Sequence, residues 1–142
     1  MSAQDVRTRP LSRTEAKRSL SKAKGSIESA RLLLGNAQYD TAGLAAIHGA
    51  ILASDAVLGY TAGLRNAAKD HKAVVTLLKK NVRGFTKTQE RQISGLLNMK
   101  NEVAYSSRLF THDETRILVD QATRYLEWVV STIGQIDGSI AG

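Results

Sequence analysis

The chain has no cysteine among its 142 residues, and it has only one proline and two phenylalanines. Without cysteine it can form no disulfide, no thiolate zinc site and no cysteine nucleophile. One proline is too few for a proline-rich linker protein. Hydrophobic residues make up 42% and charged residues 23%, as in ordinary globular proteins. The length fits a single domain at about 100–200 residues per domain.

Signals for export or membrane insertion are also lacking. The first ten residues, MSAQDVRTRP, are polar and charged, without the apolar stretch of a secretory signal. The longest uncharged run covers residues 41–54, which is shorter than the roughly 20 residues of a membrane-spanning helix. We therefore expect a cytoplasmic protein without a membrane partner.

No familiar catalytic or metal-binding motif occurs. The histidines at His48, His71 and His112 show no HxxxH or HExxH spacing, and there is no Walker loop, GxGxxG or GxSxG. The sequence therefore predicts neither a metal nor a cofactor. His48 stands in an apolar run and is interpreted as a core or groove residue, whereas His71 and His112 are interpreted as residues near helix starts.

The hydrophobic pattern predicts an all-α protein, an antiparallel up-and-down bundle of four long helices and one short helix, with no strand. Three capping-box patterns, in which a Ser or Thr is followed three residues later by Glu or Gln, begin at Ser12, Thr86 and Thr111. Asp40 and Asp70 are the expected N-caps of the two other helices. The expected helices cover 13–36, 41–62, 71–81, 87–108 and 112–134. The expected domain organisation is a flexible basic arm over 1–11, the bundle over 12–134 and a frayed tail over 135–142.

Two of these helices have distinctive patterns. The helix over 13–36 has apolar residues at alternating spacings of four and three, which favours a single helical neighbour. The helix over 41–62 is crowded with alanine and glycine. Each interior glycine costs about 1 kcal/mol relative to alanine, so burial must stabilise this helix. We predict that it is the central helix.

The charge is uneven along the chain. The net charge is +7, and residues 1–25 contribute +5 of it. One interpretation is a solvated face with a mobile arm, and the other is a strip that binds phosphate groups. No aromatic residues interleave with these charges, so a base-stacking platform is not indicated. The candidate nucleic-acid-binding residues are Arg7, Arg9, Arg13, Lys17, Lys24 and Lys100.

Polar residues interrupt the apolar stripe of the helix over 87–108. Asn101 and Tyr105 are four residues apart and share a face, and the long stem of Lys100 can reach the same side. Together these residues offer a cation, an amide and a phenol to a phosphate group. The alternative is a buried Tyr105 whose hydroxyl is hydrogen-bonded to Asn101.

The order of these segments resembles the HEPN domain family. The resemblance extends over about residues 14–133 and rests on 30–42, 45–51, 71–78 and 96–105 in that order. It implies an up-and-down bundle that usually dimerises. Many HEPN members are metal-independent endoribonucleases, often toxins paired with a nucleotidyltransferase-fold antitoxin. Their motif is an Arg, a polar residue next to it and a His five residues after the Arg, and these positions correspond to Lys100, Asn101 and Tyr105.

Two of the three motif residues differ in kind from the family pattern. Lys100 keeps the charge but lacks the bidentate fork of arginine. Tyr105 is a poor general base at pH 7, because its ordinary pKa is near 10, against about 6.5 for histidine. We therefore expect a homodimeric HEPN-like protein that binds RNA or a nucleotide, with weak or no nuclease activity. One alternative is an endoribonuclease toxin that uses Lys100, Asn101 and Tyr105. The other is a protein-interaction module.

Overall fold

The computed structural model describes residues 6–140 and shows a helical bundle with two short strands. Residues 1–5 and 141–142, which the sequence analysis assigned to the arm and the tail, lie outside the described residues. The prediction of a mostly helical protein is confirmed. The elements in chain order are β1 (Thr8–Pro10), α1 (Arg13–Gly35), α2 (Tyr39–Ala62), β2 (Leu64–Asn66), α3 (Ala73–Asn81), α4 (Lys87–Tyr105) and α5 (His112–Ile136).

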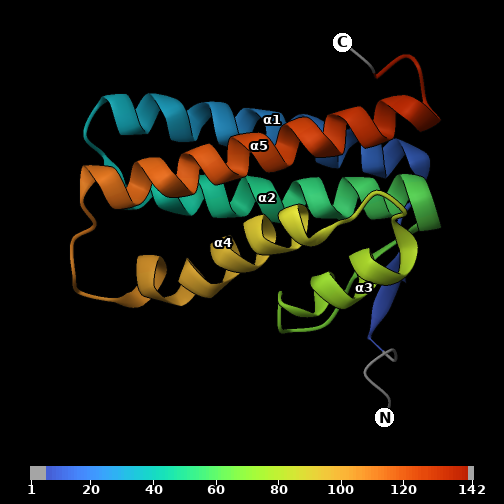
Figure 1. Cartoon of the computed structure of the whole chain (residues 1–142), viewed down its shortest axis with the longest axis horizontal. Helices are drawn as coiled ribbons and strands as arrows, with labels where there is room; N and C mark the ends of the chain where they lie inside the picture. The colour runs from blue at the N-terminus through green and yellow to red at the C-terminus, as the bar shows by residue number, and fades with distance from the viewer. Residues whose placement is uncertain (1–5, 141–142) are drawn as a thin grey trace.

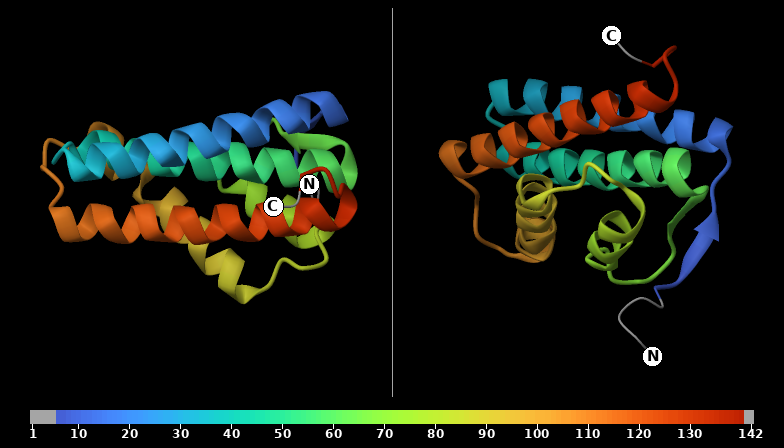
Figure 2. Two further views of the ribbon diagram at one scale, coloured as in Figure 1. Left: turned by 90° about the horizontal axis from the view of Figure 1, so that it is seen from above. Right: turned by 45° about the vertical axis from the view of Figure 1, so that its right-hand side comes forward.

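Helix α2 lies at the centre of the bundle, as its composition predicts. It packs against all four other helices, and more than half of its residues are buried. Helices α1 and α5 lie along it (Figure 1). Helices α3 and α4 lie on the other side of α2 from α1 (Figure 2). The arrangement therefore separates the outer face of α1 from the side of the molecule where α3 and α4 lie.

Small residues bring α1 and α2 into close contact. The alanines at positions 16, 23 and 30 of α1 are fully buried. A Cβ atom added to Gly49 would lie 2.5 Å from Cγ1 of Ile27, and one added to Gly59 would lie 2.5 Å from Cβ of Ala16. Two serine hydroxyls of α1 donate hydrogen bonds of 2.8 Å across the interface, from Ser19 to the carbonyl of Leu52 and from Ser26 to that of Ala45. No larger side chain would fit at these glycines without displacing α1.

The three capping boxes at Ser12, Thr86 and Thr111 are confirmed. Asp40 is not an N-cap, because α2 begins one residue before it and its carboxylate accepts a hydrogen bond of 2.9 Å from the backbone N–H of Phe110. Asp70 closes a turn ahead of α3, whose first residue is Ala73. Helix α4 ends earlier than expected, because the backbone of Ser106 is extended. Helix α5 continues two residues beyond its expected end.

The expectation of no strand is wrong for β1 and β2, which form an antiparallel pair with Arg9 opposite Arg65. Gly63 ends α2 in the left-handed conformation, with φ 67°, and turns the chain back beside the N-terminal segment. The backbone N–H of Leu11 donates to the carbonyl of Gly63 at 2.9 Å. Strands of three residues are too short to show an alternating hydrophobic pattern. Part of the expected basic arm is thus paired with the segment that follows α2.

Helix α2 is also long and apolar enough to cross a membrane by length and composition alone. In the most apolar window of this helix, 67% of the residues are buried inside the bundle. The core helix of a globular protein has the same properties, so the match is weak evidence for a membrane span.

The close approach of α2 to α1 can be tested at Gly59. We expect Gly59→Ala to lower the free energy of unfolding by about 1–3 kcal/mol, because the added methyl group overlaps Ala16 and Leu11. Gly25→Ala is the matched control, because a Cβ on this exposed α1 residue meets no atom within 4 Å. It should raise the free energy of unfolding by about 0.5–1 kcal/mol through helix propensity. Urea unfolding measures both variants, and equal effects would contradict the close packing.

Candidate functional site

The structure brings together two of the three residues of the motif on α4. Lys100 and Asn101 line a cavity of about 250 Å³ between α4 and the loop that precedes α3. Tyr105 does not line it, and its side chain is 80% exposed. It lies about 200° around the helix from the buried Val103, at 100° per residue. The interpretation of Tyr105 as a buried residue bonded to Asn101 is therefore wrong.

The cavity that Lys100 and Asn101 share is rich in positive charge, and we call it the basic cavity. Its lining consists of Lys69, Asp70, His71, Lys72, Leu97, Lys100 and Asn101. Three lysines and one histidine thus meet from two segments of the chain. Lys69 and Lys72 belong to no motif of the sequence, and His71 was expected only to stand near a helix start. The cluster of charges between positions 69 and 72 was visible, but its approach to α4 is a tertiary contact.

Asn66 holds the loop in place beside α4. Its side chain is 9% exposed, and its Oδ1 accepts a hydrogen bond of 3.0 Å from the N–H of Ala68. Its Nδ2 donates to the carbonyl of Asp70 at 3.4 Å. The carboxylate of Asp70 accepts from the backbone N–H of Lys72 at 2.9 Å, so this acid is engaged within the loop. The N–H of Ala67 also donates to the N-terminal segment.

The pKa of His71 is lowered by burial and by the charges of its neighbours. Burial lowers the pKa of His71, and the nearby charges of Lys100 and His48 lower it further, while Asp70 opposes them. His48 is exposed on α2, so of its two interpretations, as a core or as a groove residue, the first is wrong. His112 is the first residue of α5, as expected, and its ring lies edge-on to that of Tyr39 at 5.7 Å.

A second, smaller cavity adjoins the basic cavity at His71, which lines both. It measures about 150 Å³, and we call it the Asp55 cavity. Burial raises the pKa of Asp55 to about 6, and the positive charge of Arg65 offsets part of this rise. The guanidinium of Arg65 donates a hydrogen bond of 3.1 Å to the carbonyl of Asn66. Ile51 of α2 and Val74 of α3 line the same cavity, together with residues of β2 and of the loop.

The other candidate nucleic-acid-binding residues do not join Lys100 in one strip. Arg7 and Arg9 belong to the N-terminal segment, where Arg9 stands opposite Arg65 across the strand pair. The remaining three, Arg13, Lys17 and Lys24, are exposed on α1, which lies on the other side of α2 from α4 (Figure 2). Two separate basic regions therefore exist, one along α1 and one around the basic cavity.

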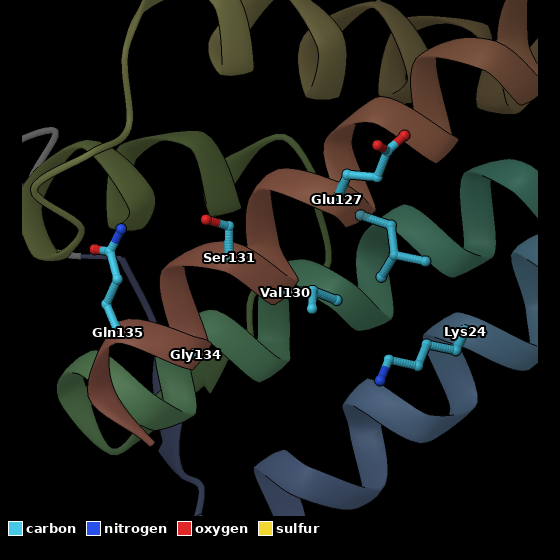
Figure 3. Close-up of a pocket in the computed structure, with 7 residues that line it drawn as sticks. Lys24, Glu127, Val130, Ser131, Gly134 and Gln135 are labelled. Carbon is cyan, nitrogen blue, oxygen red and sulfur yellow. The ribbon is translucent and has the colours of Figure 1, made fainter. Parts of the chain in front are cut away.

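A larger groove of about 600 Å³ lies between α1 and α5. Lys24 and Val130 point into the space between the two helices, whereas Ser131 and Gln135 extend to the other side of α5 (Figure 3). Glu127 also lines this groove. This groove has one lysine and one carboxylate of opposite charge, so it offers less positive charge to an anion than the basic cavity does. Over residues 6–140 there is no group of three or more side chains that could hold a metal ion.

The raised pKa of Asp55 predicts a pH dependence of stability. The folded state binds the carboxyl proton of Asp55 more tightly than the unfolded state does. In the unfolded state this carboxyl group keeps its ordinary pKa of 3.8. The free energy of unfolding should therefore fall between about pH 4 and pH 6, as Asp55 ionises inside the fold. Asp55→Asn should be about 1–3 kcal/mol more stable than the parent at pH 7, with little difference at pH 4. Urea unfolding across this range tests it, and a difference that does not change with pH would contradict it.

Comparison with known proteins adds no assignment: no protein-family model matches the chain, and no curated protein matches it.

Proposed function

We propose that this chain is a HEPN-like antiparallel up-and-down bundle that binds the phosphate groups of RNA or of a nucleotide in the basic cavity. One observation carries the proposal. Lys69, Lys72 and Lys100 meet His71 at a single cavity, although they come from two separate segments. Among the described residues, Asp70 is the only acid in the lining, and its carboxylate already accepts a hydrogen bond from the backbone of the same loop.

The physical reason is the mutual repulsion of these groups. Like charges held close together disfavour one another. Burial is the largest cause of the lowered pKa of His71, and the charge of Lys100 lowers this pKa further. A bound phosphate removes the repulsion and accepts charge-assisted hydrogen bonds from the ammonium groups. Asn101 adds an amide donor at the edge of the cavity.

A second candidate function is metal-independent RNA cleavage, and His71 is the observation that favours it. Its lowered pKa favours the neutral form at pH 7, in which an imidazole can accept a proton. Tyr105, which the HEPN resemblance would place in that role, lies outside the cavity. If the chain has nuclease activity, we expect His71 rather than Tyr105 to be the proton acceptor.

The resemblance also implies a homodimer and a nucleotidyltransferase-fold partner, and both stay predictions. Tyr105 and Leu109, each 80% exposed, form apolar surface at the end of α4 and in the connection to α5. Exposed apolar surface of this kind supports a protein contact. The alternative of a protein-interaction module without a ligand predicts no affinity for phosphate.

Lys100→Ala should weaken the binding of single-stranded RNA by about 1.5–3 kcal/mol, the scale of a charge-assisted hydrogen bond. The matched control is Lys87→Ala, which removes the same charge from an exposed position at the start of α4. It lies about 20 Å from Lys100 along the helix at 1.5 Å per residue. Fluorescence anisotropy at a fixed salt concentration measures both. The control should keep nearly full affinity, and so should Tyr105→Phe.

Equal losses in Lys100→Ala and Lys87→Ala would indicate a general charge effect and contradict a site at the basic cavity. The salt dependence gives a second measure. Each phosphate contact contributes about −0.7 to the slope of log K against log salt for single strands. An unchanged slope in Lys100→Ala would also argue against a phosphate contact at this residue.

We expect little or no cleavage of a mixed RNA by the parent protein in the presence of EDTA, because the family's Arg and His are both replaced. Gel electrophoresis of labelled RNA measures this. Strong cleavage that disappears in His71→Ala and persists in Tyr105→Phe would establish the second candidate function instead.

A further inference from the structure

The Asp55 cavity contains a carboxylate without a bonding partner. Among residues 6–140, the groups that act on Asp55 are its buried surroundings and the more distant charge of Arg65, and no hydrogen bond to the carboxylate contributes. Asp55 is half-buried, and partial burial of a carboxylate without hydrogen-bond donors is unfavourable. A ligand that brings N–H donors into the cavity would stabilise the ionised carboxylate of Asp55 through charge-assisted hydrogen bonds.

The groups around Asp55 have a definite arrangement of charge. Asp55 on α2 and Arg65 on β2 line the same cavity, yet they do not form an ion pair within 4 Å. One end of a ligand therefore meets an acceptor and another meets a donor. Ile51 and Val74 provide apolar surface for the faces of a flat group.

The size of the cavity indicates the size of the ligand. One water takes about 30 Å³ in the liquid, so the 150 Å³ of the Asp55 cavity has room for roughly five waters. A flat purine base, whose bonded atoms pack more closely than waters, is of this size. Because His71 lines both cavities, a group that fills the Asp55 cavity lies next to the lysines of the basic cavity.

We propose that the Asp55 cavity takes the guanine base of a guanosine nucleotide whose phosphate lies in the basic cavity; this inference rests on the proposed function. Guanine presents N1–H and an N2 amino group on one edge, which match the two oxygens of an ionised carboxylate. Its O6 and N7 are acceptors, and arginine is the side chain that most often donates to both. Asp55 and Arg65 supply these two complementary groups.

Adenine has the opposite pattern. Its N1 is an acceptor and would face the carboxylate of Asp55, and its N6 amino group is a donor and would face Arg65. A site with buried polar groups rejects an analogue that leaves those groups unpaired. Either purine fits the cavity by size. Only guanine has the donors and acceptors that pair with both Asp55 and Arg65.

The test compares GMP, IMP, AMP and inorganic phosphate by isothermal titration calorimetry at pH 7.5, where Asp55 is ionised. GMP should bind about 10- to 100-fold more tightly than AMP, the range expected for a good bidentate contact to a base. IMP, which lacks the N2 amino group, should fall between them. Asp55→Asn should bring GMP close to AMP and leave inorganic phosphate unchanged. Asp120→Asn is the matched control, since it removes the same charge from an exposed position on α5 and should keep the preference.

A further pair of ligands distinguishes a free nucleotide from RNA. A single-stranded oligoribonucleotide with one guanine, compared with the same oligomer with adenine, should show the same preference if the site reads RNA. A preference confined to GMP over AMP assigns the site to a free nucleotide.

The outcomes separate this inference from the proposed function. Equal binding of GMP and AMP, both weakened by Lys100→Ala, would overturn the guanine assignment and leave phosphate binding in place. A preference for GMP that survives Asp55→Asn would also overturn it. If neither nucleotide nor phosphate nor RNA binds, the proposed function fails together with this inference. Folding of Asp55→Asn is not a concern, because the substitution removes a carboxylate that burial disfavours.

Discussion

The close contact between α1 and α2 is the constraint on which the rest of the structure depends. Gly49 and Gly59 leave no space for a Cβ atom, and the alanines of α1 fit against them. Close packing of this kind gains many small dispersion contacts, and it buries the apolar residues of α1 from Ala16 to Ala30. It fixes α1 on one side of α2, so the other sides of α2 are available to α5 and to α3 and α4.

Ser54 and Asp55 are adjacent polar residues in the middle of α2. Ser54 and Tyr125 share a buried hydrogen bond of 2.7 Å that links α2 to α5. The next residue, Asp55, has no comparable partner and lines a cavity beneath the loop that leads to α3. Two adjacent polar residues of one helix thus have different environments, because they point to different neighbours. The satisfied pair contributes to the core, and the unsatisfied carboxylate defines a candidate ligand site.

The loop between β2 and α3 connects the fold to the proposed chemistry. The pairing of β1 with β2 and the two hydrogen bonds of Asn66 hold this loop. Without these contacts, the repulsion between Lys69, Lys72 and Lys100 would favour their separation, since Asp70 is the one acid that lines the cavity beside them among the described residues. The scaffold therefore holds three lysines around one cavity, and the charge of Lys100 adds to burial in lowering the pKa of His71.

Much of the architecture follows from the sequence alone, because helix periodicity and capping are local properties. The capping boxes at Ser12, Thr86 and Thr111 fixed three helix starts, and the glycines and alanines of α2 indicated its central position. The two strands escaped detection because three residues carry too little pattern. Lys100 and Asn101 were identified by the spacing of a family motif, whereas Tyr105 was assigned to the same site and lies outside it, because α4 ends there with that face in solvent.

Only the tertiary structure could reveal the basic cavity and the Asp55 cavity. Lys69, His71 and Lys72 are about thirty residues before Lys100 in the chain, and no local signal connects a loop to a helix at that separation. In the sequence, Asp55 looks like an ordinary polar residue of a helix. Its burial beneath the loop raises its pKa, and that burial is a tertiary property. The sequence determined the helices and the central place of α2 through short-range physics. The fold alone determined which charges meet, because their meeting depends on how the chain packs around α2.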